Sequence, residues 1–431
     1  MTSYAYTLET LDNGLRVFHL DLPHVHSTGL AAYVAAGPVY EGESNHGVSH
    51  MAEHLHCAVT PQHRARSDLM HAIHDLAGDF DASTDADSIR FQITVAPPLL
   101  GEAGELLSQI LAITDYPKEI IEAERRLLMT ETGDPMLSEE FKGYRALLFG
   151  RHPFGRSFGG TPRSFGRLSI EAITDFNSQA FAPDRISVAV VGRIDAGMLR
   201  RACDALARLR SVRAERLTPP DPPQIVLPRI SRLPTTQAIR HIAMGFWVPG
   251  LRDTAHKIRL NMLTSGLQLP SSPLFETLRY SAGSAYVFGS HQVGILDDVL
   301  FFFYGNVRRQ ERASFVQNVL DEIVNICEQR QAPPWFEHTR RYYQHFIECS
   351  QDVPATLAGR IAGAEVHADG GGTVTIEDEL NVIRETTWSD FSAAVRSAFR
   401  GDRFFLFFDS RFRSNPDGIK KVARSTIARL S

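Results

Sequence analysis

The order of apolar and polar residues along the chain predicts a mixture of strands and helices. Residues 89–95, Ile-Arg-Phe-Gln-Ile-Thr-Val, alternate between apolar and polar, which is typical of a half-buried β-strand. Residues 117–131 follow the helical period instead: a proline stands in the first turn, acidic residues follow it, and isoleucines and leucines form one apolar stripe. The chain therefore combines strands with amphipathic helices.

One pattern of elements occurs twice. Residues 175–192 begin with Asp-Phe, contain Pro-Asp-Arg and end in the apolar run Ile-Ser-Val-Ala-Val-Val-Gly. Residues 390–408 begin with Asp-Phe, contain Gly-Asp-Arg and end in Phe-Phe-Leu-Phe-Phe. Strand-like runs at 30–34 and 242–248 correspond more loosely. The offset of roughly 215 residues predicts a duplicated α+β unit.

The length of 431 residues is too great for one ordinary domain and suggests two of about 200 residues. Residues 219–223, Pro-Pro-Asp-Pro-Pro, cannot continue a helix and suit a semi-rigid linker. We therefore expect an N-terminal domain at 1–212, a proline-rich linker at 213–235 and a C-terminal domain at 236–431. Each domain is expected to be α+β, with a mainly antiparallel sheet covered by helices.

Composition narrows the possible functions. Hydrophobic residues make up 43% of the chain and charged residues 22%, which is typical of a globular protein with buried cores. A net charge of −5 and a pI near 6.4 do not indicate the basic surface that is typical of proteins that bind nucleic acid. No apolar run is long enough for a membrane span, and the N-terminus lacks a signal-peptide pattern. The four scattered cysteines indicate reduced thiols, so we expect a cytoplasmic protein that binds neither nucleic acid nor membrane.

Residues 50–54, His-Met-Ala-Glu-His, carry the strongest chemical signal in the chain. In a helix, positions i, i+3 and i+4 share one face, so His50, Glu53 and His54 would point into the same space. Two histidines at this spacing can bind one zinc ion, and the glutamate can take a proton from a zinc-activated water. This H-x-x-E-H order is the inverted form of a zinc-hydrolase signature.

A catalytic zinc usually has three protein ligands, so one more is needed. The helix predicted at 117–131 offers Glu122, Glu124 and Glu131, and the last two lie two helical turns apart on one side. Spacing alone does not choose between these three glutamates. Cys57, almost one turn past the second histidine, can also approach the metal, although a small buried thiol is the more usual role for such a residue.

Several blocks of the first half resemble the pitrilysin and insulin-degrading-enzyme family of zinc peptidases. The resemblance is to the short form shared with mitochondrial processing peptidase subunits and bacterial homologues. Two blocks are residues 47–54, Gly-Val-Ser-His-Met-Ala-Glu-His, and residues 124–131, Glu-Arg-Arg-Leu-Leu-Met-Thr-Glu. The landmarks that follow are His-Pro-Phe-Gly at 152–155, Gly-Gly-Thr at 159–161 and Phe-Ala-Pro-Asp-Arg at 181–185.

The resemblance assigns roles to five residues of the first half. It implies one zinc ion per chain, with His50, His54 and Glu131 as the ligands. It also implies that Glu53 is the general base and that Glu124 orients a ligand or the reacting water. The catalytic chemistry is therefore expected in the first half of the chain.

The second half has no metal motif where the first would recur, since residues 260–264 read Leu-Asn-Met-Leu-Thr. Residues 271–286 resemble a family block in which an arginine and a tyrosine seven residues apart reach the scissile peptide. Arg279 and Tyr286 keep that spacing, and a guanidinium and a phenol suit stabilisation of an oxyanion. The resemblance therefore implies that the second half is a substrate clamp.

The segment before the strand at 89–95 is similar to the family's substrate-binding edge strand. Ala82, Ser83 and Thr84 belong to it, and an added strand recognises any extended peptide through main-chain hydrogen bonds. Two positions depart from the family pattern. Asp81 replaces a usual asparagine, which adds a carboxylate, and Leu-Pro at 269–270 replaces glycines, which puts the flexibility of that loop in doubt.

Together these features predict a zinc metallopeptidase that cleaves peptides or unfolded segments. The resemblance implies a clamshell of two chains, in which Arg279 and Tyr286 of one chain serve the zinc of the other. A homodimer is the first expectation, because one chain retains both sets of residues, and a heterodimer with a homologous subunit is the second. The rival functions are a non-catalytic scaffold subunit, a peptidase that requires a partner, and a zinc hydrolase of non-peptide amides.

Overall fold

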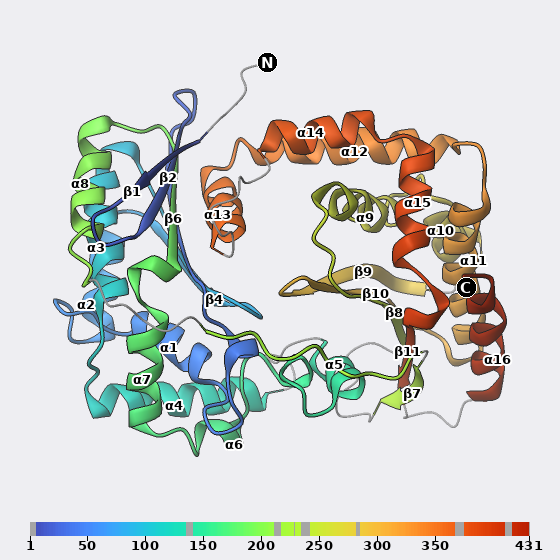
Figure 1. The fold of residues 1–431 in the computed structure, drawn as a ribbon, viewed down its shortest axis with the longest axis horizontal. Coiled ribbons are helices and arrows are strands. Elements are labelled where there is room, and N and C mark those ends of the chain that lie inside the picture. Colours follow the sequence, from blue (N-terminus) through green and yellow to red (C-terminus); the bar gives the residue numbers. More distant parts are fainter. Residues whose placement is uncertain are drawn as a thin grey trace. The chain divides into compact units, whose positions relative to one another are not determined.

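The computed structural model describes residues 6–134, 141–210, 217–227, 229–233, 242–281, 285–366, 375–409 and 416–430. The chain divides into two compact units. The first unit contains Met1–Glu139, Arg156–Pro222 and Cys349–Thr375, and the second contains Glu140–Gly155, Pro223–Glu348 and Ile376–Ser431. Each unit has one β-sheet with its own helices, as Figure 1 shows, so the predicted α+β class is confirmed.

The sheet of the first unit has six strands in the order β1-β2-β6-β3-β5-β4. Only β2 and β6 pair in parallel, and the other neighbours are antiparallel, as predicted. The strand at 89–95 has the predicted bounds, and its residues alternate between buried and half-buried. The strands are β1 (Thr7–Thr10), β2 (Arg16–Asp21), β3 (Thr28–Val34), β4 (Asp79–Thr84), β5 (Ile89–Val95) and β6 (Ile186–Gly192).

Helices cover this sheet. One of them, α13, comes from far down the chain and packs on β3, β5 and β6. Its backbone comes so close to β3 that a Cβ atom on Gly29 would lie 2.7 Å from the Cα atom of Ala355. The helices of the first unit are α1 (Val48–His56), α2 (Arg66–Asp75), α3 (Leu100–Ala112), α4 (Lys118–Gly133), α6 (Pro162–Phe165), α7 (Ile170–Ala180), α8 (Ala196–Leu206) and α13 (Pro354–Glu365).

The sheet of the second unit has five strands in the order β7-β11-β8-β10-β9. The strands are β7 (Arg229–Leu233), β8 (Ile242–Val248), β9 (Ala285–Ile295), β10 (Asp298–Val307) and β11 (Phe404–Asp409). The helices are α5 (Lys142–Phe149), α9 (Thr254–Leu267), α10 (Pro273–Phe275), α11 (Arg312–Glu328), α12 (Pro334–Ser350), α14 (Ile376–Glu385), α15 (Trp388–Ala398) and α16 (Pro416–Ile427).

The two sheets share one topology, which confirms the duplication read from the sequence. In the first unit, the strand of the repeated pattern is β6, which pairs in parallel with β2 and antiparallel with β3. In the second unit the strand of the pattern is β11, which pairs in parallel with β7 and antiparallel with β8. The described part of the second sheet has no counterpart of β1.

The units exchange segments, so they do not coincide with the contiguous domains expected from the sequence. Residues 140–155 belong to the second unit, and residues 349–375 belong to the first. The predicted linker, 213–235, also contains the strand β7. Because Arg229-Ile-Ser-Arg-Leu233 has three polar residues of five, it lacks the apolar run that predicts a buried strand.

The structure also describes two other features of the chain, the hydropathy of its helices and the state of its cysteines. No helix within the described ranges is both long and apolar enough to cross a bilayer. The four cysteines, Cys57, Cys203, Cys327 and Cys349, are all free thiols.

The crossing of α3 and α8 yields a testable prediction about packing. A Cβ atom on Gly104 would lie 2.3 Å from the Cβ atom of Ala202, so Gly104→Ala must push the two helices apart. Overpacking of this kind costs about 1–3 kcal/mol, against a gain of about 1 kcal/mol in helix propensity. We expect a net loss of up to about 2 kcal/mol in the free energy of unfolding, measured by urea denaturation.

The control for this substitution is Gly166→Ala. A Cβ atom there would lie 3.5 Å from the nearest atom, which is ordinary contact. We expect little change in its unfolding midpoint. Equal unfolding midpoints for wild type and Gly104→Ala would contradict this prediction, because they would show that α3 and α8 accommodate the added methyl group without cost.

Candidate metal centre

Helix α1 presents the H-x-x-E-H residues on one face, as predicted. The helix begins after Gly47, whose φ of 92° lies in the left-handed region that favours glycine. His50 and Glu53 are buried, and the side chain of His54 is only 15% exposed. The imidazole rings of the two histidines lie 4.8 Å apart between centroids. The helix therefore places two ring nitrogens and a carboxylate next to each other.

Helix α4 supplies the third candidate ligand. One ligand atom from each of His50, His54 and Glu131 lies within 4.8 Å of the other two. The Nε2 atom of His50 is 3.7 Å from Oε1 of Glu131, and the Nε2 atom of His54 is 3.6 Å from Oε2 of the same carboxylate. Among the described residues, this is the one group of histidines, cysteines and acids that can hold a metal ion.

The chemistry of this cluster fits a zinc ion. Zinc bonds of about 2.0–2.1 Å in a tetrahedral site separate neighbouring ligand atoms by about 3.3 Å, slightly less than the distances from Glu131 to the two histidines. Imidazole nitrogen and carboxylate oxygen are both ligands that zinc accepts in open catalytic sites. The carboxylates of Glu53 and Glu124 stand beside the cluster, so negative charge around it favours a cation.

Each histidine is oriented through its second ring nitrogen. Nδ1 of His50 donates to the carbonyl oxygen of Gly159 at 2.9 Å, and Nδ1 of His54 donates to Oε2 of Glu124 at 3.1 Å. Both acceptors lack a proton to give, so the Nδ1 atoms carry the hydrogens and the Nε2 lone pairs remain for an ion. The Gly-Gly-Thr landmark thus contributes a carbonyl that orients the first histidine.

Glu124 is itself held by an arginine. Nη2 of Arg66 donates to Oε1 of Glu124 at 2.8 Å, while the other oxygen accepts from His54. Burial alone raises the pKa of Glu124, but the hydrogen bonds from His54 and Arg66 and the charge of Arg66 outweigh it and lower the pKa below its usual value. Glu124 is therefore an anion that holds His54 in one orientation.

Glu53 is connected to the edge strand of the first sheet. Oγ1 of Thr84 donates to Oε2 of Glu53 at 2.8 Å, and the same carboxylate oxygen lies 4.0 Å from Nε2 of His50. Thr84 is the last residue of β4, which also contains Ala82 and Ser83 and lies at the edge of the sheet. The predicted peptide-binding strand therefore adjoins the predicted general base.

The departure at Asp81 is compensated locally. Nη2 of Arg90, on the neighbouring strand β5, forms an ion pair with the carboxylate of Asp81. The Nε atom of the same arginine donates to Oγ of Ser83 at 3.1 Å. The extra carboxylate on β4 therefore has a cation beside it, which weakens the effect on substrate charge that the sequence suggested.

Two other side chains at the end of α1 belong to the core. His56 is fully buried, stacks on Phe181 with 3.8 Å between centroids, and donates from Nδ1 to the carbonyl of Ile110. Burial lowers the pKa of His56 to about 4. Burial also raises the pKa of the Cys57 thiol well above its usual value, and Cys57 is not part of the metal-binding group.

Glu41 supports the helix that carries the candidate ligands, and the sequence analysis did not identify it. Its two carboxylate oxygens accept from the backbone N–H groups of Gly47 and Ser49 at 2.7 and 2.8 Å, so it caps the start of α1. Glu41 is buried, and burial raises its pKa to about 7, although the hydrogen bonds and Arg156 act in the opposite direction. A buried glutamate seven residues before the first residue of its helix has no periodic signal in the sequence.

The predicted clamp residues lie in the second unit. Arg279 is exposed in a π-helical turn, Glu276–Ser281. Tyr286 is in β9, and its side chain lies outside the described residues. Leu269 lies in the turn after α9, where its N–H donates to the carbonyl of Gly266.

Comparison with known proteins identifies the family. A family model described as "Insulinase (Peptidase family M16)" matches residues 16–136, and one described as "Peptidase M16 inactive domain" matches residues 167–335. An uncharacterized zinc protease of Mycobacterium bovis is 29% identical over 290 residues. That match covers 64% of this chain and 64% of the relative, so the chain spans less than two thirds of the curated relative's length.

Solved structures have the same fold at low sequence identity. A protease from Helicobacter pylori superposes with a TM-score of 0.81 at 18% identity, over 95% of this chain and 100% of that one. A "peptidase M16 inactive domain" from Pseudomonas fluorescens superposes with a TM-score of 0.79 at 14% identity, over 94% of this chain and 98% of that one. The shared fold thus includes a protein that is described as an inactive domain.

Two homologous α+β units, with one His-His-Glu cluster in the first, define the class of this chain as zinc-protease-like. The chain belongs to the insulinase family of peptidases, family M16, in its short form. The resemblance read from the sequence is therefore confirmed.

The raised pKa of Glu41 predicts a pH dependence of stability. Between its ordinary pKa of 4.5 and the folded value of about 7, the folded chain binds the proton more tightly than the unfolded chain. The stability that Glu41 contributes is therefore present below about pH 4.5 and lost as the pH rises through 7, by up to about 3 kcal/mol. Urea denaturation of metal-free wild type and Glu41→Gln at several pH values measures this.

The difference between the two chains isolates Glu41, because glutamine does not titrate and all other groups are common to both. We expect the stability of wild type relative to Glu41→Gln to fall between pH 5 and pH 7.5. A difference that is constant over this range would contradict the raised pKa.

Proposed function

We propose that this chain is a zinc metallopeptidase whose catalytic centre is formed by α1 and α4. The observation that carries the proposal is the convergence of His50, His54 and Glu131, with the Glu53 carboxylate beside them. The zinc proteases among its relatives support a zinc ion at this site. One zinc ion per chain is part of the proposal.

The three ligand residues would hold the zinc, and hydrogen bonds to the Gly159 carbonyl and the Glu124 carboxylate orient the two histidines. A zinc ion bound there supplies Lewis acidity toward water and toward the scissile carbonyl. Glu53 takes a proton from the water and delivers it to the leaving amine. Glu124 keeps the imidazole of His54 in one tautomer, and Thr84 holds the Glu53 carboxylate by donating to one of its oxygens.

The substrate in this proposal is an extended peptide that pairs with the outer edge of β4. Strand β4 is an edge strand, so its outer N–H and C=O groups suit addition of another strand. Ala82, Ser83 and Thr84 would supply these main-chain hydrogen bonds. The side chain of Thr84 bonds Glu53, which brings a peptide paired at this edge close to the general base.

The proposal also includes a dimer, in which residues of one chain act at the zinc site of the other. Arg279 and Tyr286 of one chain would brace the oxyanion at the zinc of a second copy, since the chain carries both sets of residues. A heterodimer with a homologous subunit is the alternative, as is a partner-dependent or non-catalytic role. Reduced cysteines support a cytoplasmic location for the assembly.

Replacing Glu53 by glutamine separates metal binding from catalysis. Glu53 is not one of the three ligands, so we expect Glu53→Gln to bind about one zinc per chain, as wild type does. Loss of the general base should lower the hydrolysis rate of a mixed peptide pool by about 100-fold or more. Zinc is measured by elemental analysis, and cleavage by mass spectrometry of the peptides.

The possible results of this experiment distinguish the proposed mechanism from its alternatives. A wild-type chain without zinc, or a Glu53→Gln chain that cleaves normally, would remove the proposed mechanism. A zinc-loaded wild-type chain that cleaves nothing by itself would favour the partner-dependent alternative.

Replacing Glu124 tests its role in orienting His54. Glu124→Gln keeps the shape of the side chain but removes the carboxylate that accepts from Nδ1 of His54 and from Arg66. Loss of such a partner typically weakens metal affinity about 10–100-fold. We expect this loss in a zinc-chelator competition assay, which requires no activity measurement.

The matched control lies on the same helix. Glu122 forms an ion pair with Arg125 rather than with a metal ligand, so Glu122→Gln should leave zinc affinity unchanged. Equal zinc affinity in the Glu124 and Glu122 variants would contradict the positioning role of Glu124.

A further inference from the structure

The second sheet ends in an open strand edge where the first sheet has one more strand. In the first unit, β2 pairs in parallel with β6 and is covered on its other side by β1. In the second unit, β7 takes the position of β2, and the described residues place no strand on its other side. Such an edge presents N–H and C=O groups that can bind an added strand.

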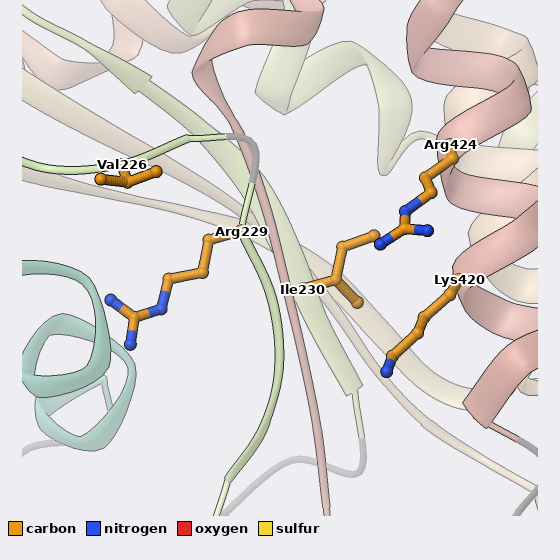
Figure 2. Close-up of a pocket in the computed structure, with 5 residues that line it drawn as sticks. All are labelled: Val226, Arg229, Ile230, Lys420 and Arg424. Carbon is orange, nitrogen blue, oxygen red and sulfur yellow. The ribbon is translucent and has the colours of Figure 1, made fainter.

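A pocket lies along this edge, shown in Figure 2. It is lined by Val226, Arg229, Ile230, Lys420 and Arg424. Because neighbouring residues of a strand point to opposite faces, Arg229 and Ile230 leave β7 on opposite sides. Figure 2 shows Lys420 and Arg424 reaching from α16 toward Ile230, while Arg229 extends on the other side of the strand. A strand added here would meet cations on both of its faces.

Among the residues that the structure describes, the cations that line the pocket have no acidic partner. Lys420 and Arg424 lie four residues apart on α16, so the two like charges are neighbours on one helix face and repel each other. Within the described part of the chain, neither residue forms an ion pair, and neither does Arg229. Arg429, just past the same helix, pairs with two acids of α11. The pocket therefore suits carboxylates supplied from outside.

We propose that the outer edge of β7 binds an extended acidic peptide segment as an added strand. Main-chain hydrogen bonds to β7 fix the segment, and its side chains select for charge. Two consecutive acidic residues place one carboxylate toward Arg229 and the next toward Lys420 and Arg424. Val226, which is 85% exposed, offers an apolar contact beside them. The site is separate from the zinc-binding residues and does not depend on the proposed catalytic function.

Fluorescence anisotropy with a defined probe tests this site. The probe is a labelled, N-acetylated octapeptide in which two consecutive glutamates stand among valines and threonines. It is titrated against the Glu53→Gln chain, so that cleavage does not interfere. We expect saturable binding that weakens about threefold in Lys420→Ala and about tenfold in Lys420→Ala/Arg424→Ala, because each exposed ion pair contributes a small factor. Added salt should weaken it as well.

The matched control is Lys421→Ala. Lys421 is exposed on the same helix and carries the same charge, but it does not line the pocket. We expect its affinity to match that of the parent chain. The same peptide with glutamine in place of both glutamates should bind at least about tenfold more weakly.

Hydrogen exchange of the parent chain provides a readout that needs no substitution. An added strand protects backbone amides, so the peptide should slow exchange in residues 229–233. Absence of this protection, or equal affinity for the glutamine peptide, would overturn the proposal. Binding of inorganic phosphate that requires Lys420, without peptide protection of β7, would identify a free-anion site and would also overturn it.

Discussion

The candidate metal centre depends on one constraint: the Nδ1 atoms of His50 and His54 must each donate a hydrogen bond. The carbonyl of Gly159 and the carboxylate of Glu124 accept these two hydrogens, so both Nε2 atoms face the Glu131 carboxylate. Without these acceptors an imidazole can rotate or change tautomer, and the three ligand atoms no longer converge. The helix that carries both rings is in turn capped by Glu41.

The sequence predicted those parts of the site that follow helical periodicity. The spacing of His50, Glu53 and His54 implied one helix face, and the resemblance chose Glu131 among three glutamates. Arg66, the Gly159 carbonyl and Glu41 were not predicted, because each acts through a contact between distant segments that leaves no periodic trace. A backbone carbonyl in particular is present in every residue, so no residue type in the sequence indicates its role.

The fold was predicted at the level of the repeat, and less well at its boundaries. The shared turn before the two apolar runs marked β6 and β11, which occupy equivalent places in their sheets. The strand β7 was assigned to a linker because it is short and polar, which is also what leaves a charged, open edge. The membership of residues 140–155 in the second unit and of residues 349–375 in the first was not predicted. The sequence pattern of a buried helix does not show which sheet the helix covers.

The position of α13 determines when the first unit can be completed during synthesis. This helix packs directly on the backbone of β3, yet it is made after most of the second unit. A growing chain released only as far as the first two hundred residues therefore leaves one face of the first sheet bare to solvent. The sheet against which the candidate metal-binding helix α1 packs is therefore covered by α13 only late, when nearly the whole polypeptide has left the ribosome.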